Sequence, residues 1–194
     1  MKNFDVVIVG GGVVGSASAY YLKKHGFTGS IAIVEQDTTW QSGCTARSAG
    51  GIRQQFSTPE NIKLSLFGLN VVRNLKQEFG ADADVGFKEQ GYLILATESG
   101  LPILEENQIV QLAEGADNVI LEGDELSARF PWLISEGLAG GCFGLSGEGW
   151  MDPYLMMSMF RKAAIASGVT LIDGTVAGVS RSGNRFTGVT LASC

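Results

Sequence analysis

Residues 5–35 read DVVIVGGGVVGSASAYYLKKHGFTGSIAIVE, and this stretch decides the fold of the chain. An apolar run, Val6 to Val9, is typical of a buried parallel strand and leads directly into the glycine-rich turn Gly10 to Gly15. A helical pattern follows, and a second apolar run, Ile31 to Val34, ends at the acidic residue Glu35. This order of strand, turn, helix, strand and acid predicts a βαβ unit that binds a dinucleotide.

The glycines of this turn have distinct steric roles. Gly10 permits the tight turn, Gly12 lets the backbone approach a pyrophosphate, and Gly15 lets the helix pack closely against the strand. The N-terminus of the helix offers N–H groups and a positive dipole end to the phosphates. Glu35 can accept hydrogen bonds from both ribose hydroxyls, and its charge would repel a 2′-phosphate. The alternative, a glycine-rich turn in an unrelated α/β protein, would not require the strand, helix and acid that flank it.

Composition limits the class of protein. The chain has 194 residues, 45% of them hydrophobic, and a net charge of −6 at pH 7 without a Lys/Arg block, which argues against nucleic acid or an anionic membrane as a partner. No apolar run approaches the roughly 20 residues that cross a bilayer. The first predicted strand begins at Val6, which leaves no room for a signal or transit peptide, so we expect a cytoplasmic protein. Cys44, Cys142 and Cys194 are scattered, which predicts neither a disulfide framework nor a metal site.

The remaining sequence predicts a second domain within the first. Residues 36–56 are rich in Thr, Ser and Gly and predict a long functional loop. The patterns beyond it predict helices over residues 59–79, 102–113, 124–130 and 153–167, and strands over residues 85–97, 119–121, 138–145, 169–172, 175–180 and 186–191. Asp152 is expected to cap the last helix, and Ser182-Gly183-Asn184 to form the hairpin turn between the last two strands. We therefore expect an α/β fold in which residues 1–80 and 146–194 form a Rossmann-like nucleotide-binding domain, and residues 81–145 belong to an inserted α+β substrate domain.

Together these motifs resemble the FAD-dependent amine and amino-acid oxidoreductases, a superfamily with D-amino-acid oxidase, glycine oxidase, sarcosine oxidase and dimethylglycine dehydrogenase. The nearest subgroup is related to a mitochondrial respiratory complex I assembly factor. The resemblance rests on the N-terminal βαβ unit, on SGCTARSAGGIRQQF with the PENIKLSLFG that follows it, on DELSARFPWL, and on GEGWMDPYLMMSMFRKAAIASGVTL. Such enzymes are about twice as long, so the resemblance implies an N-terminal portion whose fold is incomplete at the C-terminus and whose activity alone is in doubt.

The resemblance implies FAD as the cofactor, with the loop from Ser42 to Gln54 along the ribityl chain and flavin ring, and with the backbone of Val176 on the adenine. Ser48 stands where some relatives carry a histidine bonded to the flavin, which implies a non-covalent flavin. The cofactor-binding candidates are Gly10, Gly12, Val14, Gly15, Glu35, Gln36, Ser42, Arg47, Ser48, Ala49, Gly50, Gly51 and Val176.

The resemblance further implies oxidation of the C–N bond of a small amine or amino acid, with hydride transfer to flavin N5 and reoxidation by oxygen or a redox carrier. Arg47 and Arg53 are the catalytic candidates, because a cation near the flavin could stabilise its reduced form or bind a substrate carboxylate. The alternative for each is a solvent-facing or phosphate-bridging arginine. His25, the only histidine, is expected at the far end of the first helix from the pyrophosphate and is not a catalytic candidate.

Two other functions stay open. The chain could be a non-catalytic FAD-binding scaffold or assembly factor, as the nearest subgroup permits. It could also be an NAD-dependent dehydrogenase, although such enzymes usually continue into a regular α/β alternation, whereas a long Gly/Ser/Thr loop follows Glu35. The substrate and the oligomeric state, homo-oligomeric or hetero-oligomeric, stay open as well.

Overall fold

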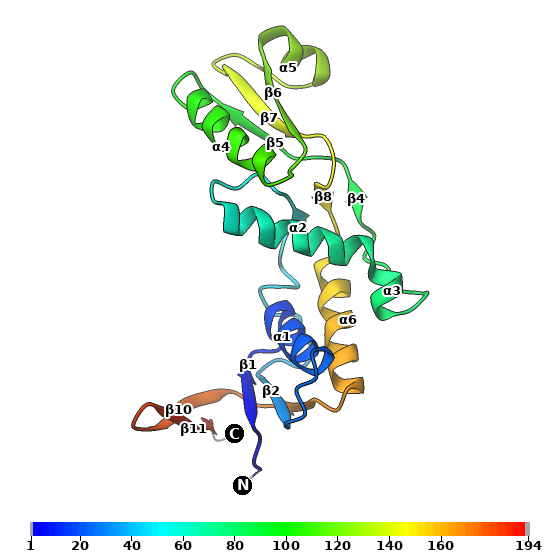
Figure 1. Cartoon of the computed structure of the whole chain (residues 1–194), viewed down its shortest axis with the longest axis vertical. Coiled ribbons are helices and arrows are strands. Elements are labelled where there is room, and N and C mark those ends of the chain that lie inside the picture. The colour runs from blue at the N-terminus through cyan, green and yellow to red at the C-terminus, as the bar shows by residue number, and fades with distance from the viewer. Residues whose placement is uncertain (1, 193–194) are drawn as a thin grey trace. The chain divides into compact units, whose positions relative to one another are not determined.

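The structure is a computed structural model that describes residues 2–192. The chain forms two compact units, which we call unit 1 (Met1–Ala49 and Asp152–Cys194) and unit 2 (Gly50–Met151). Figure 1 labels most elements of both units. Each unit is described by itself below.

A parallel sheet forms the centre of unit 1. Its order is β1 (Val6–Val9), β2 (Ile31–Glu35) and β9 (Thr170–Asp173), and the register pairs Ile8 with Ile33 and Ile33 with Leu171. Helix α1 (Val13–Lys24) connects β1 to β2, and helix α6 (Pro153–Ala166) precedes β9. The predicted α/β fold is thereby confirmed: the late helix and strand rejoin the sheet that the N-terminal βαβ unit begins.

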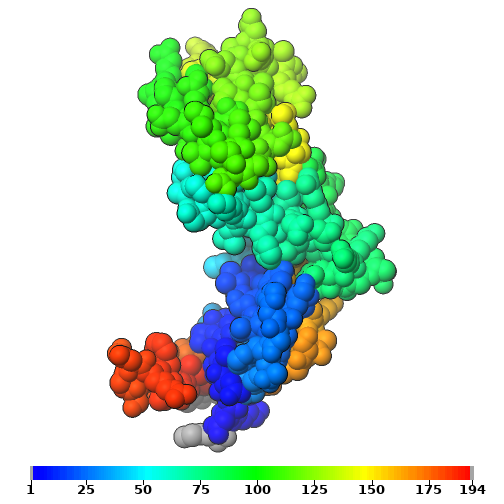
Figure 2. Space-filling view, viewed as in Figure 1, coloured from blue at the N-terminus to red at the C-terminus, as the bar shows by residue number. Residues whose placement is uncertain are grey.

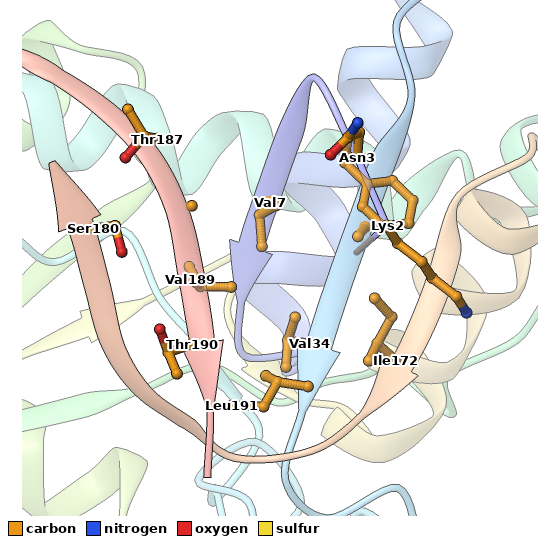
Figure 3. A pocket seen from close by; sticks show the side chains of 13 residues that line it. Lys2, Asn3, Val7, Val34, Ile172, Ser180, Thr187, Val189, Thr190 and Leu191 are labelled. Atoms are coloured by element: carbon orange, nitrogen blue, oxygen red, sulfur yellow. The ribbon is translucent and has the colours of Figure 1, made fainter. Parts of the chain in front are cut away.

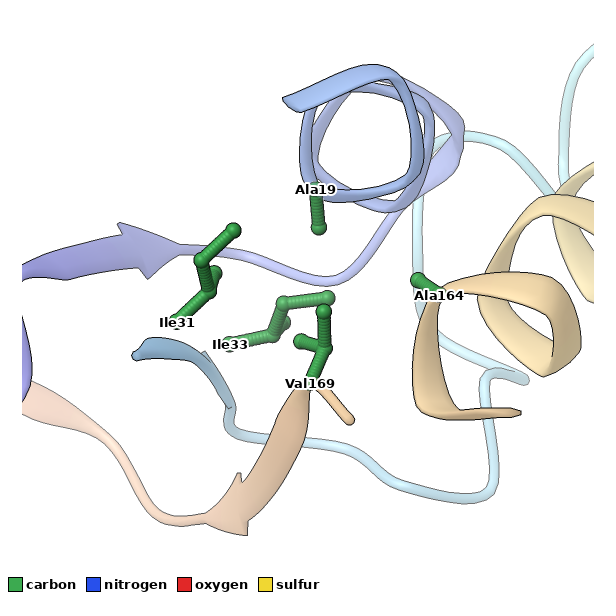
Figure 4. Close-up of a cluster of buried hydrophobic side chains, with 5 residues drawn as sticks. All are labelled: Ala19, Ile31, Ile33, Ala164 and Val169. Carbon is green, nitrogen blue, oxygen red and sulfur yellow. The ribbon is translucent and has the colours of Figure 1, made fainter. Parts of the chain in front are cut away.

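The core of unit 1 lies between this sheet and the helices α1 and α6. Ile31 and Ile33 project from one face of β2 and pack with Ala19, Ala164 and Val169, all at most 4% exposed (Figure 4). Alternation along the strand directs the intervening residues to the opposite face. The small alanines let both helices lie close to the sheet. Helix α6 begins where Asp152 caps it, because the carboxylate accepts hydrogen bonds from the N–H groups of Tyr154 and Leu155.

The opposite face of the sheet lines a cavity beside a hairpin. Strands β10 (Val176–Ser182) and β11 (Arg185–Leu191) pair antiparallel, as the sequence predicts, and Gly183 in their turn has φ 58°. Figure 2 shows this hairpin, in red, projecting from the rest of unit 1. A cavity of about 860 Å³ lies between hairpin and sheet, with Val7 and Val34 on the strands and Val189 on the hairpin among its lining residues (Figure 3).

Unit 2 contains two small antiparallel sheets and four helices. Its strands pair in the orders β5-β7-β6 and β3-β8-β4. Their bounds are β3 Gly51–Ile52, β4 Lys88–Glu89, β5 Leu93–Ala96, β6 Asn118–Glu122, β7 Gly140–Gly144 and β8 Gly149–Trp150, and those of the helices are α2 Pro59–Arg73, α3 Leu75–Phe79, α4 Leu101–Ala113 and α5 Gly123–Arg129.

The helix predicted over residues 59–79 is two helices. Asn74 leaves the helical conformation, with φ −110° and ψ 20°, and its side chain donates a hydrogen bond to the carbonyl of Asn70. Such local competition with the backbone is typical of asparagine. Both helices pack within unit 2, whereas the sequence places them with residues 1–80. The two units are defined by packing and not by cofactor binding, so the assignment of residues 1–80 and 146–194 to cofactor binding stays a prediction.

Candidate functional site

The glycine-rich turn has the close backbone approach that its sequence predicts. Gly10 has φ 96°, in the left-handed region that favours glycine. A Cβ added at Gly15 would lie 2.0 Å from the carbonyl oxygen of Gly10, so only glycine lets α1 begin this close to β1. Gly12 precedes the first residue of α1 and contributes no side-chain cap. The N-cap position of α1 therefore carries no side chain that would compete with a phosphate for this end of the helix.

Glu35 ties the end of β2 to this turn. Its Oε2 accepts a hydrogen bond of 2.7 Å from the N–H of Gly11, and its Oε1 accepts one of 2.9 Å from the N–H of Asp37. The side chain is half-buried. The carboxylate is thus held beside the glycine turn at the carboxyl end of a parallel strand, which is where α/β sheets bind their ligands.

A cavity of about 210 Å³ opens at this end of the sheet. It brings together four of the predicted cofactor ligands, Gly10, Glu35, Gln36 and Val176, with Val9, Val34, Gly174 and Thr175. The larger cavity beside the hairpin contains none of the predicted ligands. The smaller cavity is therefore the candidate nucleotide site, because it combines the acid at the end of β2, a glycine of the turn and the backbone of the first hairpin strand.

Two side chains of the following loop pack on the turn, and sequence reasoning missed both. Thr45 accepts a hydrogen bond of 3.1 Å at Oγ1 from the N–H of Val13, the first residue of α1. Trp40 is buried, has φ 66° and lies against Gly11, where an added Cβ would be 2.6 Å from its ring. The guanidinium of Arg161 stacks on that ring at 4.2 Å. A lone large aromatic residue in a Thr/Ser/Gly loop was the available signal.

Asp37 organises the same loop. Its carboxylate accepts hydrogen bonds from the hydroxyls and the N–H groups of Ser42 and Thr39. These hydrogen bonds, those of Ser42 first, hold the pKa of the Asp37 carboxyl well below its ordinary value of 3.8. Ser42, a predicted flavin-loop residue, therefore has a structural partner in this structure.

The other predicted loop residues are divided between the units. Arg47, Ser48 and Ala49 are exposed in unit 1, and Val14 is 78% exposed at the start of α1. Gly50, Gly51 and Arg53 lie in unit 2: the carbonyl of Gly50 accepts from the N–H of Met151, and Gly51 pairs with Trp150. The exposed Arg53 lies over the ring of Phe56 at 4.9 Å. The catalytic roles of the two arginines stay predictions.

A buried carboxylate in unit 2, Glu148, is a further residue that sequence reasoning did not identify. It is 1% exposed, and its Oε1 accepts from the N–H groups of Gln54 at 2.6 Å and Gln55 at 3.2 Å. Its Oε2 accepts from Nε2 of Gln55 at 2.7 Å.

Burial raises the pKa of the nearby Cys142 thiol to about 11, and the charge of Glu148 adds to that rise. Cys44 is exposed, and Cys194 lies outside the described residues.

Comparison with known proteins agrees with this geometry. The DAO family, described as FAD dependent oxidoreductase, matches residues 5–193. The chain belongs to this FAD-dependent oxidoreductase family. FAD is accordingly its cofactor, and the glycine turn, the Glu35 carboxylate and the cavity at Val176 have the chemistry that the adenosine half of FAD requires.

The family's relatives are longer proteins. The chain is 44% identical over 179 residues to FAD-dependent oxidoreductase domain-containing protein 1 of Xenopus laevis, covering 89% of this chain and 36% of that protein. It is 27% identical to the mitochondrial sarcosine dehydrogenase of Mus musculus, covering 87% of this chain and 18% of the relative. The chain thus spans about a third or less of the curated relatives.

Solved structures show the same fold. L-proline dehydrogenase from P. horikoshii superposes with a TM-score of 0.81 at 25% identity, covering 97% of this chain and 49% of that one. Glycine oxidase from Geobacillus kaustophilus superposes with a TM-score of 0.73 at 27% identity, covering 91% of this chain and 48% of that one. Within residues 2–192, none of the helices combines the length and the apolar character that a membrane span requires.

Proposed function

We propose that this chain forms the FAD-binding part of an oxidoreductase that oxidises the C–N bond of a small amine or amino acid. The observation that carries the proposal is the 210 Å³ cavity, where Glu35 and Val176 meet at the carboxyl end of the parallel sheet. The substrate class is supported by the names of relatives and structural neighbours: sarcosine dehydrogenase, dimethylglycine dehydrogenase, glycine oxidase and L-proline dehydrogenase.

The residues of unit 1 would hold the adenosine and pyrophosphate of FAD. The carboxylate of Glu35 would accept from the ribose hydroxyls, and the backbone of Val176 and Gln36 would line the adenine end. The backbone from Gly10 to Gly15, with Val14 in the first turn of α1, would face the pyrophosphate. When bound, FAD supplies a two-electron acceptor for oxidation of the substrate C–N bond.

The loop residues would serve the flavin end of the cofactor. Ser42, Ser48, Ala49, Gly50 and Gly51 are the candidates that would contact the ribityl chain or the ring. Arg47 and Arg53 are exposed cations, and a guanidinium binds a carboxylate by two parallel hydrogen bonds. Either arginine would anchor the carboxylate of an amino-acid substrate and fix its orientation.

The cofactor is tested by titrating the purified chain with FAD and following the change in flavin absorption. We expect saturable binding, and acid precipitation should release yellow colour into the supernatant because Ser48 cannot form a covalent bond to the flavin. Glu35→Ala should bind FAD more weakly than the wild type. Glu136→Ala is its matched control, since Glu136 is exposed and distant in sequence from the motif. Colour that stays in the pellet would contradict the non-covalent cofactor.

The reaction is tested on a protein of the full length found in the relatives. Sarcosine, dimethylglycine, glycine and L-proline are mixed with the FAD-loaded protein, first without air, then in air, and then with an artificial electron acceptor. Flavin bleaching by one of these amines without air would establish the substrate class, and the dependence on acceptor would separate oxygen from a redox carrier.

Two relatives that are 44% and 43% identical to the chain have a name that gives a cofactor but no substrate, which favours keeping the non-catalytic scaffold as the second candidate. Stoichiometric FAD binding without bleaching by any amine would support the scaffold. The cytoplasmic location stays a prediction, and the related sarcosine and dimethylglycine dehydrogenases are named as mitochondrial proteins.

A further inference from the structure

We propose that Glu148 is a positioning residue that fixes the flavin-loop segment, Gly50–Gln55, from inside unit 2. This inference rests on the proposed function, in which that segment contributes Gly50, Gly51 and Arg53 to the flavin end of the site. The role follows from where the three hydrogen-bond donors of Glu148 come from: all belong to the consecutive residues Gln54 and Gln55.

Glu148 is itself held in place by contacts with neighbouring strands and loops of unit 2. The carbonyl of Glu148 accepts a hydrogen bond of 2.9 Å from the N–H of Gly91. A Cβ added at Gly144 would lie 1.9 Å from Oε2 of Glu148, so the side chain lies directly on the backbone of β7. The following residue, Gly149, pairs with both Ile52 and Glu89 in the β3-β8-β4 sheet. Glu148 therefore cannot shift without moving the strand that pairs with the flavin-loop segment.

The charge makes this attachment specific. Glu148 takes part in neither the Lys63–Glu114 nor the Arg73–Glu89 ion pair. A buried carboxylate without a cation requires N–H donors, and charge-assisted hydrogen bonds are about twice as strong as neutral ones. Gln54 and Gln55 supply these donors, and their own burial, at 2% and 5% exposure, keeps water from replacing either partner.

The same contacts decide which side chains of the segment can meet a ligand. Gln54 and Gln55 are directed into the interior of unit 2, where Nε2 of Gln55 also donates to the carbonyl of Tyr92 at 3.0 Å. Arg53, one residue earlier, is exposed. Glu148 thus holds the two glutamines as an internal anchor, and this anchoring sets the direction of Arg53 and the backbone of Gly51.

The decisive variant is Glu148→Gln. The new amide keeps one oxygen for the N–H groups of Gln54 and Gln55, but its NH₂ group faces Nε2 of Gln55, donor against donor. Amide hydrogen exchange of Gln54 and Gln55 is measured by NMR on the chain without FAD, and the FAD dissociation constant is measured by titration. We expect the exchange rates to rise at least about tenfold and the dissociation constant to rise about tenfold, since hydrogen bonds to charged groups carry such an effect. Glu136→Gln is the control, with changes below about twofold expected for an exposed site.

A second variant tests the pairing itself. Gln55→Met removes the donor that would oppose the new amide. In the Gln55→Met protein, adding Glu148→Gln should therefore raise the FAD dissociation constant less than about threefold, whereas the same substitution raises it about tenfold in the wild type, as expected for two residues in contact. Equal ratios in both backgrounds would overturn the pairing. If Glu148→Gln fails to fold, Gln55→Met alone removes one of the donors and should still raise the exchange rate of the Gln54 amide.

The outcomes separate this inference from the proposed function. Unchanged exchange at Gln54 and Gln55 overturns the anchoring by Glu148, whatever FAD does. Faster exchange with an unchanged FAD dissociation constant overturns the role in cofactor positioning. A wild-type chain that does not bind FAD at all contradicts the proposed function, while the exchange data still decide whether Glu148 anchors the segment.

Discussion

Glu35 and Glu148 are both carboxylates held by backbone N–H groups, but they sit in opposite environments. Glu35 is half-buried beside a cavity, and its partners Gly11 and Asp37 belong to the same βαβ unit or the residues just after it. Glu148 is 1% exposed, and its partners lie 93 and 94 residues away in the chain. Glu35 can therefore meet water or a ligand from the cavity, whereas Glu148 is enclosed with its protein partners.

The contrast shows how one type of contact serves two purposes. At Glu35 the hydrogen bonds hold an acid ready for an exchangeable ligand, so a substitution there should act mainly on cofactor binding. At Glu148 they satisfy a charge in the protein interior, so a substitution there should act on folding as well. Four substitutions test this division.

Glu148→Ala should have the largest effect, with the free energy of unfolding lowered by about 4 kcal/mol, because each buried donor left without a partner costs about 1–3 kcal/mol. Urea-induced unfolding monitored by circular dichroism measures the change. Glu136→Ala, at an exposed position, should stay within about 0.5 kcal/mol of the wild type. A loss no greater than that of the control would remove the distinction between the two acids.

Gly15→Ala should lower the free energy of unfolding by about 3 kcal/mol, since the added methyl would lie 2.0 Å from the Gly10 carbonyl oxygen and α1 would have to move. FAD binding should be lost with it, because the turn is displaced. Gly188→Ala in β11 is the control in the same unit, where an added Cβ meets nothing within 4 Å. Equal stability of both variants would show that α1 is not held at this distance.

Glu35→Ala should weaken FAD binding by about 1.5–3 kcal/mol, the value of hydrogen bonds to a charged group. Its effect on unfolding should be smaller than that of Glu148→Ala, because Glu35 is half-buried and lines the adjacent cavity, whereas Glu148 is 1% exposed. The dissociation constant from an FAD titration is compared with the urea midpoint. An unchanged dissociation constant would show that Glu35 is not the ribose ligand.

Asp37→Asn should have the smallest effect, and it should depend on pH. The pKa of Asp37 is lowered in the folded chain, so its contribution to stability is present above its ordinary value of 3.8 and is lost as the pH falls below that value toward the folded pKa. The difference in urea midpoint between wild type and variant should therefore shrink on acidification from pH 7. Asp82→Asn, at an exposed position, should show no such trend.

The parts of the fold that sequence predicts are those specified by short-range pattern. The βαβ unit lies within residues 5–35, and the Asp152 cap and the hairpin turn at Gly183 are each encoded by a few neighbouring residues; all three are present. The break at Asn74 was not predicted, because the apolar spacing of the predicted helix continues through it.

The site follows the same rule. Gly10, Glu35, Gln36 and Val176 could be placed from motif and resemblance, and they line one cavity. Glu148 could not, because an acid in a glycine-rich segment gives no sign of partners more than 90 residues away. Only the packed structure shows that the acid is buried and which donors satisfy it.

The contact of Trp40 with Gly11 has an optical consequence. The chain has three tryptophans, and Trp132 and Trp150 are 75% and 46% exposed, whereas Trp40 is 7% exposed. A water-soluble quencher such as iodide should therefore quench the fluorescence of Trp132 and Trp150 first. The remaining emission, shifted to shorter wavelength, should come from Trp40. Because that ring lies on the glycine turn, its residual fluorescence reports directly on the place where the phosphates of a nucleotide would arrive.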